Sequence, residues 1–221
     1  MLRFLAWRLC FEWVNLKRLF GHGSKRVFYL GFGANLSSNI LAERRISPLD
    51  SRLFTLRDYA LRFDHPSPWE NCSYASAEYA PGENLHGMLL TLSARDAARM
   101  DFYESVPFIK RYRRTWVEQD GLRLYYYQTN RSTPGLNPTA EYLGYIVDGL
   151  RNHPDVDDDY QAWIRSHPTA EPGPLVTSYA SPHQAGKSRL VDRYRLVSLK
   201  LFLDVISYTS LTEWLIPKPD P

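Results

Sequence analysis

The feature that most constrains this chain is an apolar run at residues 27–36, which reads VFYLGFGANL. A short run of β-branched, aromatic and aliphatic residues favours a buried strand, and the two glycines within it favour a tight turn at its end. The polar segment 37–46 has serines at its start and Pro48 just beyond its end, which favours a short helix. The sequence therefore predicts a strand, a turn and a helix in close succession.

Short strands separated by turn residues dominate the next part of the chain. Strands are predicted at 57–63, 72–78 and 85–92, and turn-rich pieces at 65–69 and 81–84. An Asp-Gly turn signal predicts a hairpin with strands at 111–119 and 122–130. Helices are predicted at 93–105, 138–152 and 155–166, whereas 191–214 fits either a strand or a helix. The chain is thus expected to mix strands with helices.

The beginning of the chain carries an apolar stripe at the spacing of a helix, made by Leu2, Leu5, Leu9, Trp13, Leu16 and Phe20. Arg8 and Glu12 interrupt the apolar run, so residues 2–20 make a poor membrane span and a poor secretory signal. Three interpretations stay open: a helix packed on the body, a helix on a membrane surface, and an organelle transit segment. Residues 21–24 then favour a hinge.

The formal net charge is +3, but the charge is unevenly spread. Residues 1–25 hold five cations and one anion, which gives +4, so the rest of the chain sums to −1. A broad phosphate-binding face needs many converging cations, so no nucleic-acid partner is expected. The one segment that favours a nucleic-acid partner is the basic run from Lys110 to Arg114, although alternation along a strand would divide its side chains between two faces.

Most patterns of common active sites are missing from the sequence. The six histidines form no HExxH grouping, and Cys10 and Cys72 match neither a disulfide nor a metal spacing. There is no GxSxG and no GxxxxGK[ST], and GFGANL lacks the third glycine of a dinucleotide-binding loop. The sequence thus argues against hydride transfer and nucleotide hydrolysis, and we expect no metal, no cofactor and a reducing compartment, the cytoplasm.

Two features could still carry chemistry. The glycine-bearing turn at 32–36 is either a simple strand exit or a nest whose backbone N–H groups bind an oxyanion. Glu104 ends a helix that is otherwise apolar on that face. It is either a solvent-facing residue or, if buried, a carboxyl suited to proton transfer near neutral pH. Neither feature alone decides between its two interpretations.

Together the two features resemble the γ-glutamylcyclotransferase family. That family has a Y-G-S-N-L loop after its first strand, which resembles Phe32-Gly33-Ala34-Asn35-Leu36, and a later L-D-x-x-E-G segment, which resembles Met100-Asp101-Phe102-Tyr103-Glu104-Ser105. Segments at 85–87, 126–130 and 138–142 also match in family order, so the resemblance covers residues 27–165. Three residues depart from the family pattern: Phe32 stands for Tyr, Ala34 for Ser and Ser105 for Gly.

The resemblance implies a fold and a domain organisation. We expect a mixed α/β (α+β) fold, with a small closed or nearly closed β-barrel and flanking helices, over residues 25–170. Residues 1–24 would form a basic amphipathic helix and a hinge. Residues 171–221 would form a C-terminal extension packed on the same domain.

The resemblance also implies an activity, the release of 5-oxoproline from a small γ-glutamyl compound by a monomer or homodimer. Glu104 would be the general acid/base, and a pocket beside it would bind the substrate through Phe32, Gly33, Ala34, Asn35 and Leu36, with Tyr112 and Tyr126 as further wall candidates. Two alternatives remain, a non-catalytic ligand-binding module on the same fold and a nucleic-acid binder that uses residues 110–114.

Overall fold

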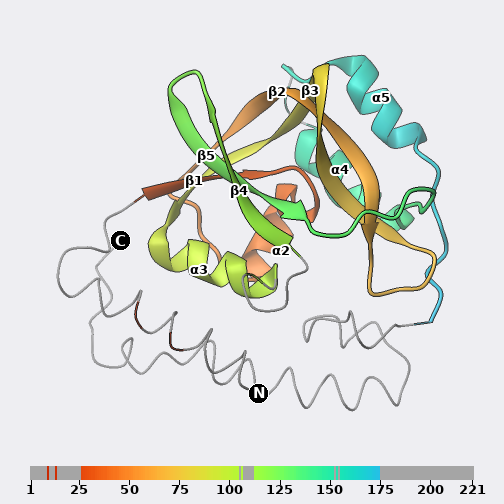
Figure 1. The fold of residues 1–221 in the computed structure, drawn as a ribbon, viewed down its shortest axis with the longest axis horizontal. Helices are drawn as coiled ribbons and strands as arrows, with labels where there is room; N and C mark the ends of the chain where they lie inside the picture. The colour runs from red at the N-terminus through yellow and green to blue at the C-terminus, as the bar shows by residue number, and fades with distance from the viewer. Residues whose placement is uncertain are drawn as a thin grey trace.

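The computed structural model describes residues 26–104, 106, 112–151, 153 and 155–174, together with Leu9 and Trp13 (Figure 1). Leu9 and Trp13 are helical and exposed. The rest of the predicted helix at 2–20, Cys10, Lys110, Arg111 and the segment 191–214 lie outside the described residues. None of the helices in the described part of the chain is both long and apolar enough to span a bilayer.

A five-stranded sheet with the order β2-β3-β1-β5-β4 organises the molecule. Its strands are β1 (Arg26–Gly31), β2 (Asp50–Pro66), β3 (Ser73–Ser93), β4 (Tyr112–Gln119) and β5 (Leu122–Thr129). β1 pairs in parallel with β5, and all the other pairs are antiparallel. The predicted β4–β5 hairpin is confirmed, because Asp120 and Gly121 turn the chain with φ values of 55° and 73°.

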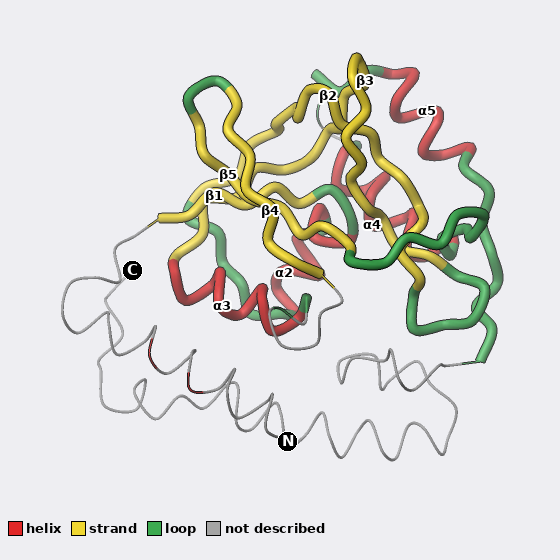
Figure 2. Tube along the Cα trace, viewed as in Figure 1, coloured by secondary structure: helices red, strands yellow, loops and turns green. Residues whose placement is uncertain are grey.

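Helices surround this sheet, which confirms the predicted mixed α/β class (Figure 2). They are the 3₁₀ turn η2 (Ala34–Leu36), α2 (Ser38–Glu43), α3 (Ala94–Tyr103), α4 (Ala140–Leu150) and α5 (Asp158–Ser166). Apolar residues of β1, β3 and β5 meet Met100 of α3 and Ile146 of α4 in one continuous core. α4 begins where the Thr139 hydroxyl accepts a hydrogen bond from the Tyr142 N–H, as an N-cap residue does.

The sheet is not closed, so within the predicted closed or nearly closed barrel the closed form is wrong. Its edge strands are β2 and β4, and the pairing found in the described residues runs only from β2 through β3, β1 and β5 to β4. A side chain bridges the two edges instead. The Gln119 amide at the end of β4 accepts a hydrogen bond from the Arg57 N–H of β2 and donates one to the Thr55 carbonyl, both at 2.9 Å. The sheet therefore curls far enough for a side-chain contact but not for a backbone ladder.

The turn predicted at 81–84 is wrong, because β3 continues through it without a break. The pairing of β2 with β3 shifts register between Arg57 and Tyr59. At this bulge Asp58 has a φ of 62° and Gly82 a φ of 86°, and the Gly82 N–H donates to the Asp58 carboxylate at 2.8 Å. Glycine and proline at a bulge resemble a turn in sequence, since both positions need an irregular backbone.

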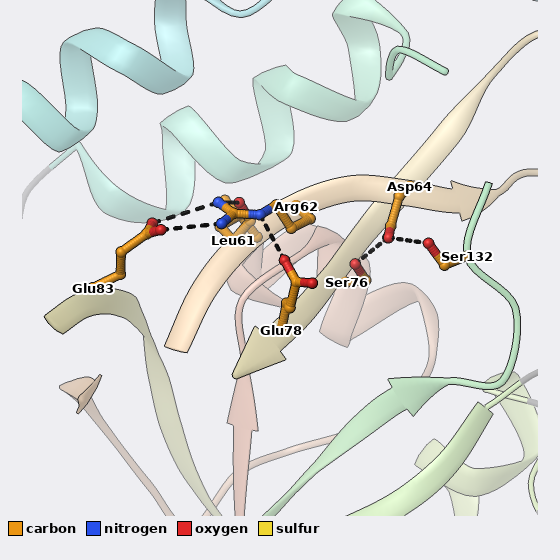
Figure 3. A network of polar contacts seen from close by, with 7 residues as sticks. All are labelled: Leu61, Arg62, Asp64, Ser76, Glu78, Glu83 and Ser132. Carbon is orange, nitrogen blue, oxygen red and sulfur yellow. Dashed lines mark hydrogen bonds and ion pairs between the residues drawn. The ribbon is translucent and has the colours of Figure 1, made fainter. Parts of the chain in front are cut away.

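Polar contacts tie β2 to β3 and to the loop after β5 (Figure 3). Arg62 of β2 pairs with Glu78 at 2.9 Å and with Glu83 at 3.0 Å. Further along β2, the Asp64 carboxylate accepts hydrogen bonds from Ser76 and from Ser132. These contacts hold the two long strands together around a second register shift, which lies between Arg62 and His65.

Candidate active site

The turn after β1 is held by close packing on two sides, against the backbone of β3 and the Tyr142 side chain of α4. A Cβ atom at Gly87 of β3 would lie 2.6 Å from the Gly31 carbonyl oxygen, so only glycine allows β1 and β3 to approach this closely. A Cβ atom at Gly33 would lie 2.5 Å from the Tyr142 hydroxyl of α4. That hydroxyl also accepts a hydrogen bond from the Ala75 N–H at 3.1 Å. The glycines therefore let α4 and β3 fix the position of the turn.

The backbone of η2 also packs directly on the backbone of α4, at Gly149. A Cβ atom at Gly149 would lie 2.4 Å from the Leu36 Cβ and 2.9 Å from the Leu36 carbonyl carbon and oxygen. The helix backbone thus lies against the loop backbone, and Leu36 itself is buried. Leu36 therefore supports the loop by packing against α4.

Asn35 of the loop and Glu104 of α3 meet, although 69 positions separate them in the sequence. The Asn35 amide donates to Glu104 Oε1 at 3.1 Å and to the Tyr29 hydroxyl at 2.7 Å. Glu104 directly follows α3, and its N–H donates to the Met100 carbonyl at 2.9 Å, which continues the last helical turn. The two features that the sequence singles out therefore form one cluster of polar side chains.

Arg44, the first residue after α2, completes this cluster. Its Nη1 donates to Glu104 Oε1 at 2.8 Å and to the Asn35 side-chain carbonyl at 2.7 Å. The Arg44 and Glu104 side chains are only 13% and 14% exposed, so this ion pair is largely removed from water. Burial alone would lower the pKa of Arg44, but the charge and hydrogen bond of Glu104 raise it instead, so the guanidinium stays charged.

The hydroxyls of Tyr29 and Tyr142 both lie in the field of the Glu104 carboxylate. Burial and then the charge of Glu104 raise the pKa of Tyr29 well above its ordinary value. Burial raises the pKa of Tyr142 too, although hydrogen bonds with the backbone of Ala75 and Ala34 oppose the shift. Both phenols are therefore neutral over the physiological pH range and can serve as hydrogen-bond partners.

A second ion pair braces the end of α3 against the β4–β5 hairpin. Both oxygens of Asp101 accept hydrogen bonds from Arg114 at 2.8 Å, and one of them also accepts from the Tyr127 hydroxyl at 2.8 Å. Burial raises the pKa of Asp101 in spite of Arg114 and Tyr127. The Arg114 guanidinium also lies over the Tyr125 ring, 4.3 Å from its centroid. Because Glu104 lies one helical turn after Asp101, this brace fixes its position.

The tyrosines of β5 lie on two faces of the strand, and the predicted Tyr126 lies on a different face from its neighbours. Tyr125 and Tyr127 both lie with their ring centroids 5.3 Å from that of Tyr29, on the Glu104 side. Tyr126 points to the opposite face, where its ring is 6.0 Å from Phe32 and 5.8 Å from Tyr59. The structure thus brings Asn35 to Glu104 and Phe32 to Tyr126.

The remaining predicted residues lie around these two groups. Tyr112 at the start of β4 lies beside His65, with 4.3 Å between ring centroids. Gly33 and Ala34 lie beside the Tyr142 hydroxyl. Within the described residues, no cluster of three or more His, Cys, Asp and Glu side chains could hold a metal ion.

Sequence reasoning did not single out Arg44 or Tyr29, and it considered Arg114 only as part of the basic run 110–114, whereas the structure pairs Arg114 with Asp101. Arg44 stands in an Arg-Arg pair after the predicted helix at 37–46, and nothing in the local pattern distinguishes it from the exposed Arg45. The apolar run around Tyr29 predicts only a buried strand. A usable signal came from the segment at 138–142, whose last residue is the Tyr142 that contacts the loop.

Comparison with known proteins supports this picture of the fold. No protein-family model matches the sequence. The γ-glutamyl cyclotransferase verK of Clonostachys rogersoniana is 32% identical over 56 residues, and the match spans 25% of this chain but only 31% of that curated relative.

Solved structures cover far more of the chain. A γ-glutamyl cyclotransferase aligns with a TM-score of 0.54 at 16% identity, over 79% of this chain and 99% of that one. An uncharacterised protein from Homo sapiens aligns with a TM-score of 0.55 at 18% identity, over 78% and 99% of the two chains. The chain therefore has the γ-glutamyl cyclotransferase fold, and one segment of it is similar to a curated γ-glutamyl cyclotransferase.

Proposed function

We propose that the protein cyclises the γ-glutamyl group of a γ-glutamyl amino acid, amine or peptide to 5-oxoproline and releases the amine. The observation that carries this proposal is the hydrogen bond from Asn35 to Glu104 Oε1 at 3.1 Å. It joins the loop after the first strand to the helix glutamate, and these are the two segments that resemble the family. A carboxylate beside backbone and amide donors is also what an internal acyl transfer needs.

The reaction closes a ring within the substrate. The α-amine nitrogen attacks the γ-carbonyl carbon, the new C–N bond forms, and the old amide C–N bond breaks as the amine leaves. Because the nucleophile and the carbonyl belong to one molecule, their effective concentration is high, and the protein has no need to supply a nucleophile. No water is consumed, and the atoms balance between the γ-glutamyl compound and its two products.

Glu104 takes a proton from the α-ammonium, which frees the amine to attack, and returns it to the leaving nitrogen. One carboxylate can do both, because the proton that it gains in the first step is the one that it gives up in the second. The second proton that the ring nitrogen loses leaves with the released amine, which departs as an ammonium ion. Asn35 and Arg44 orient the carboxylate through Oε1. The N–H groups of Gly33 and Asn35 stabilise the oxyanion that forms at the γ-carbonyl, since the first turn of a helix does not use them internally. The Ala34 backbone instead holds the Tyr142 hydroxyl beside the loop.

The site has a charge balance suited to this substrate. The γ-glutamyl group carries one ammonium and one carboxylate, and the site offers one carboxylate, Glu104, beside one guanidinium, Arg44. Tyr29 supplies a neutral hydroxyl close to both charges, and Tyr142 supplies one in the field of Glu104. A zwitterionic head group therefore leaves no charge of the site without an opposite partner.

The test is the release of 5-oxoproline, measured by mass spectrometry, from a panel of γ-glutamyl amino acids, γ-glutamyl amines and glutathione. Glu104→Gln preserves the shape of the side chain but cannot relay a proton, so kcat should fall by about 10²- to 10⁴-fold with little change in KM. The matched control is Glu43→Gln, an exposed glutamate at the end of α2, which should leave turnover unchanged.

Two results would contradict the proposal. One is a folded Glu104→Gln protein that keeps more than about a tenth of the turnover, since loss of a general acid/base costs more than that. The other is turnover of an N-acetylated γ-glutamyl compound, because its blocked α-amine cannot attack and the reaction would then be hydrolysis by water.

A further inference from the structure

The guanidinium of Arg44 uses only one of its nitrogens for the cluster around Glu104. Nη1 makes the contacts with Glu104, with Asn35 and, at 3.8 Å, with the Met100 sulfur. The guanidinium carbon lies 5.1 Å from the centre of the Tyr103 ring. Among the contacts of the described residues, Nη2 and Nε of Arg44 take no part. The guanidinium thus keeps a pair of donors in a geometry that fits a second carboxylate.

The other charged groups of the site are already committed to one another. Asp101 and Arg114 form a two-point pair through both carboxylate oxygens, and Tyr127 adds a third bond. Within the part of the chain that the structure describes, Arg44 is the cation that contacts Glu104. An anionic group that arrives beside Glu104 therefore meets the guanidinium of Arg44 first.

The chemistry of a γ-glutamyl group brings such an anion to this point. Its α-ammonium and α-carboxylate are attached to the same carbon, so a base that reaches the ammonium lies next to the carboxylate as well. A cation in direct contact with that base is therefore within reach of the carboxylate. We propose that Arg44 recognises the α-carboxylate of the γ-glutamyl group and so holds the α-amine on Glu104, an inference that rests on the proposed function.

The charge changes during the reaction support this assignment. When Glu104 accepts the proton, its carboxyl becomes neutral and no longer balances Arg44. A largely buried guanidinium without an anion is strongly unfavourable. A substrate carboxylate on the same guanidinium supplies the missing charge for as long as Glu104 is protonated. Arg44 then has an anionic partner at each stage of the proton transfer.

The experiment compares ligands that differ only in the α-carboxylate. Binding of 5-oxoproline and of 5-oxoprolinamide, in which an amide replaces that carboxylate, is measured by calorimetry for the wild type, Arg44→Gln and Arg44→Lys. Turnover is measured in parallel for the best γ-glutamyl compound of the panel and for its α-carboxamide. Arg151→Gln is the matched control, because this arginine forms an exposed ion pair with Asp148 on α4. Circular dichroism and a melting curve check that each variant is folded.

We expect the wild type and Arg151→Gln to prefer the carboxylate ligand by about 10- to 100-fold, as hydrogen bonds to a charged group allow. Arg44→Gln should lose this preference, and Arg44→Lys, which keeps the charge but not the forked geometry, should retain part of it. If Arg44→Gln weakens or slows both ligands equally and keeps the preference, Arg44 only orients Glu104 and the inference is overturned.

The two proposals fail in different ways. A wild type that releases 5-oxoproline but shows no preference for the carboxylate overturns the role of Arg44 and leaves the proposed function standing. A wild type that turns over no γ-glutamyl compound overturns the proposed function. In that case the binding titration still tests Arg44. A wild-type preference for 5-oxoproline over 5-oxoprolinamide that disappears in Arg44→Gln supports carboxylate recognition by Arg44. A wild type without this preference refutes carboxylate recognition.

Discussion

The two glycines of α4 should respond to the same substitution in opposite directions. At Gly144 an added Cβ meets nothing within 4 Å, so Gly144→Ala should only improve the helix, by about 0.8–1.0 kcal/mol. At Gly149 the added Cβ would lie 2.4 Å from the Leu36 Cβ and 2.9 Å from the Leu36 carbonyl atoms. Backbone atoms cannot rotate away, so the overpacking should cost about 1–3 kcal/mol and outweigh the gain in helix propensity.

The assay is thermal and urea unfolding of both variants beside the wild type. Since about 1 kcal/mol shifts the melting temperature of a chain of this size by about 2–4 °C, Gly144→Ala should melt a few degrees higher and Gly149→Ala lower. Gly149→Ala should also lose turnover, because a displaced Leu36 carries Asn35 away from Glu104. If the two variants were equally stable, or if Gly149→Ala were the more stable, the direct packing of α4 on η2 would be refuted.

Two more outcomes follow from the buried polar groups. Asp101→Asn leaves the Arg114 guanidinium facing a neutral amide, so the free energy of unfolding should fall by about 3 kcal/mol in a urea titration, and a loss below about 0.5 kcal/mol would contradict the brace. Burial lowers the pKa of both His86 and His167 from the ordinary value of 6.5, so the folded state binds protons less readily than the unfolded one. The free energy of unfolding should therefore fall as the pH drops below about 6.5. His167→Phe, which keeps the ring contact with Phe63, should reduce this loss between pH 7.5 and pH 5.5. The same pH dependence in His167→Phe as in the wild type would contradict a contribution from His167.

The sequence predicts features that rest on local backbone chemistry. Asp120-Gly121 predicts its hairpin because both residues reach positive φ at low cost. The strand and the turn at 27–36 follow in the same way from an apolar run and two glycines. The same local reasoning fails at 81–84, where proline and glycine serve a bulge inside one long strand, since a bulge and a turn need the same residue types.

Features that rest on long-range contacts could not be predicted from local pattern. The ion pair between Arg44 and Glu104 joins residues 60 positions apart, and nothing beside either residue in the sequence indicates its partner. The choice between the two faces of β5 depends on the register with β1, where Tyr29 pairs with Tyr125. A shift of one residue exchanges the two faces of a strand. A motif match therefore shows that Tyr126 belongs to the strand, but it does not show which face of the sheet the side chain occupies.

The bridge that Gln119 forms between the two edge strands has a consequence for solubility. An uncovered edge strand offers its N–H and C=O groups as a template on which a second chain can add a strand and start an aggregate. At the outer edge of β2, the Arg57 N–H and the Thr55 carbonyl are the groups that such an intruding strand would use. The Gln119 amide occupies both of them with the donor and acceptor pattern of a neighbouring peptide group, so one side chain protects this part of the edge from association with other molecules.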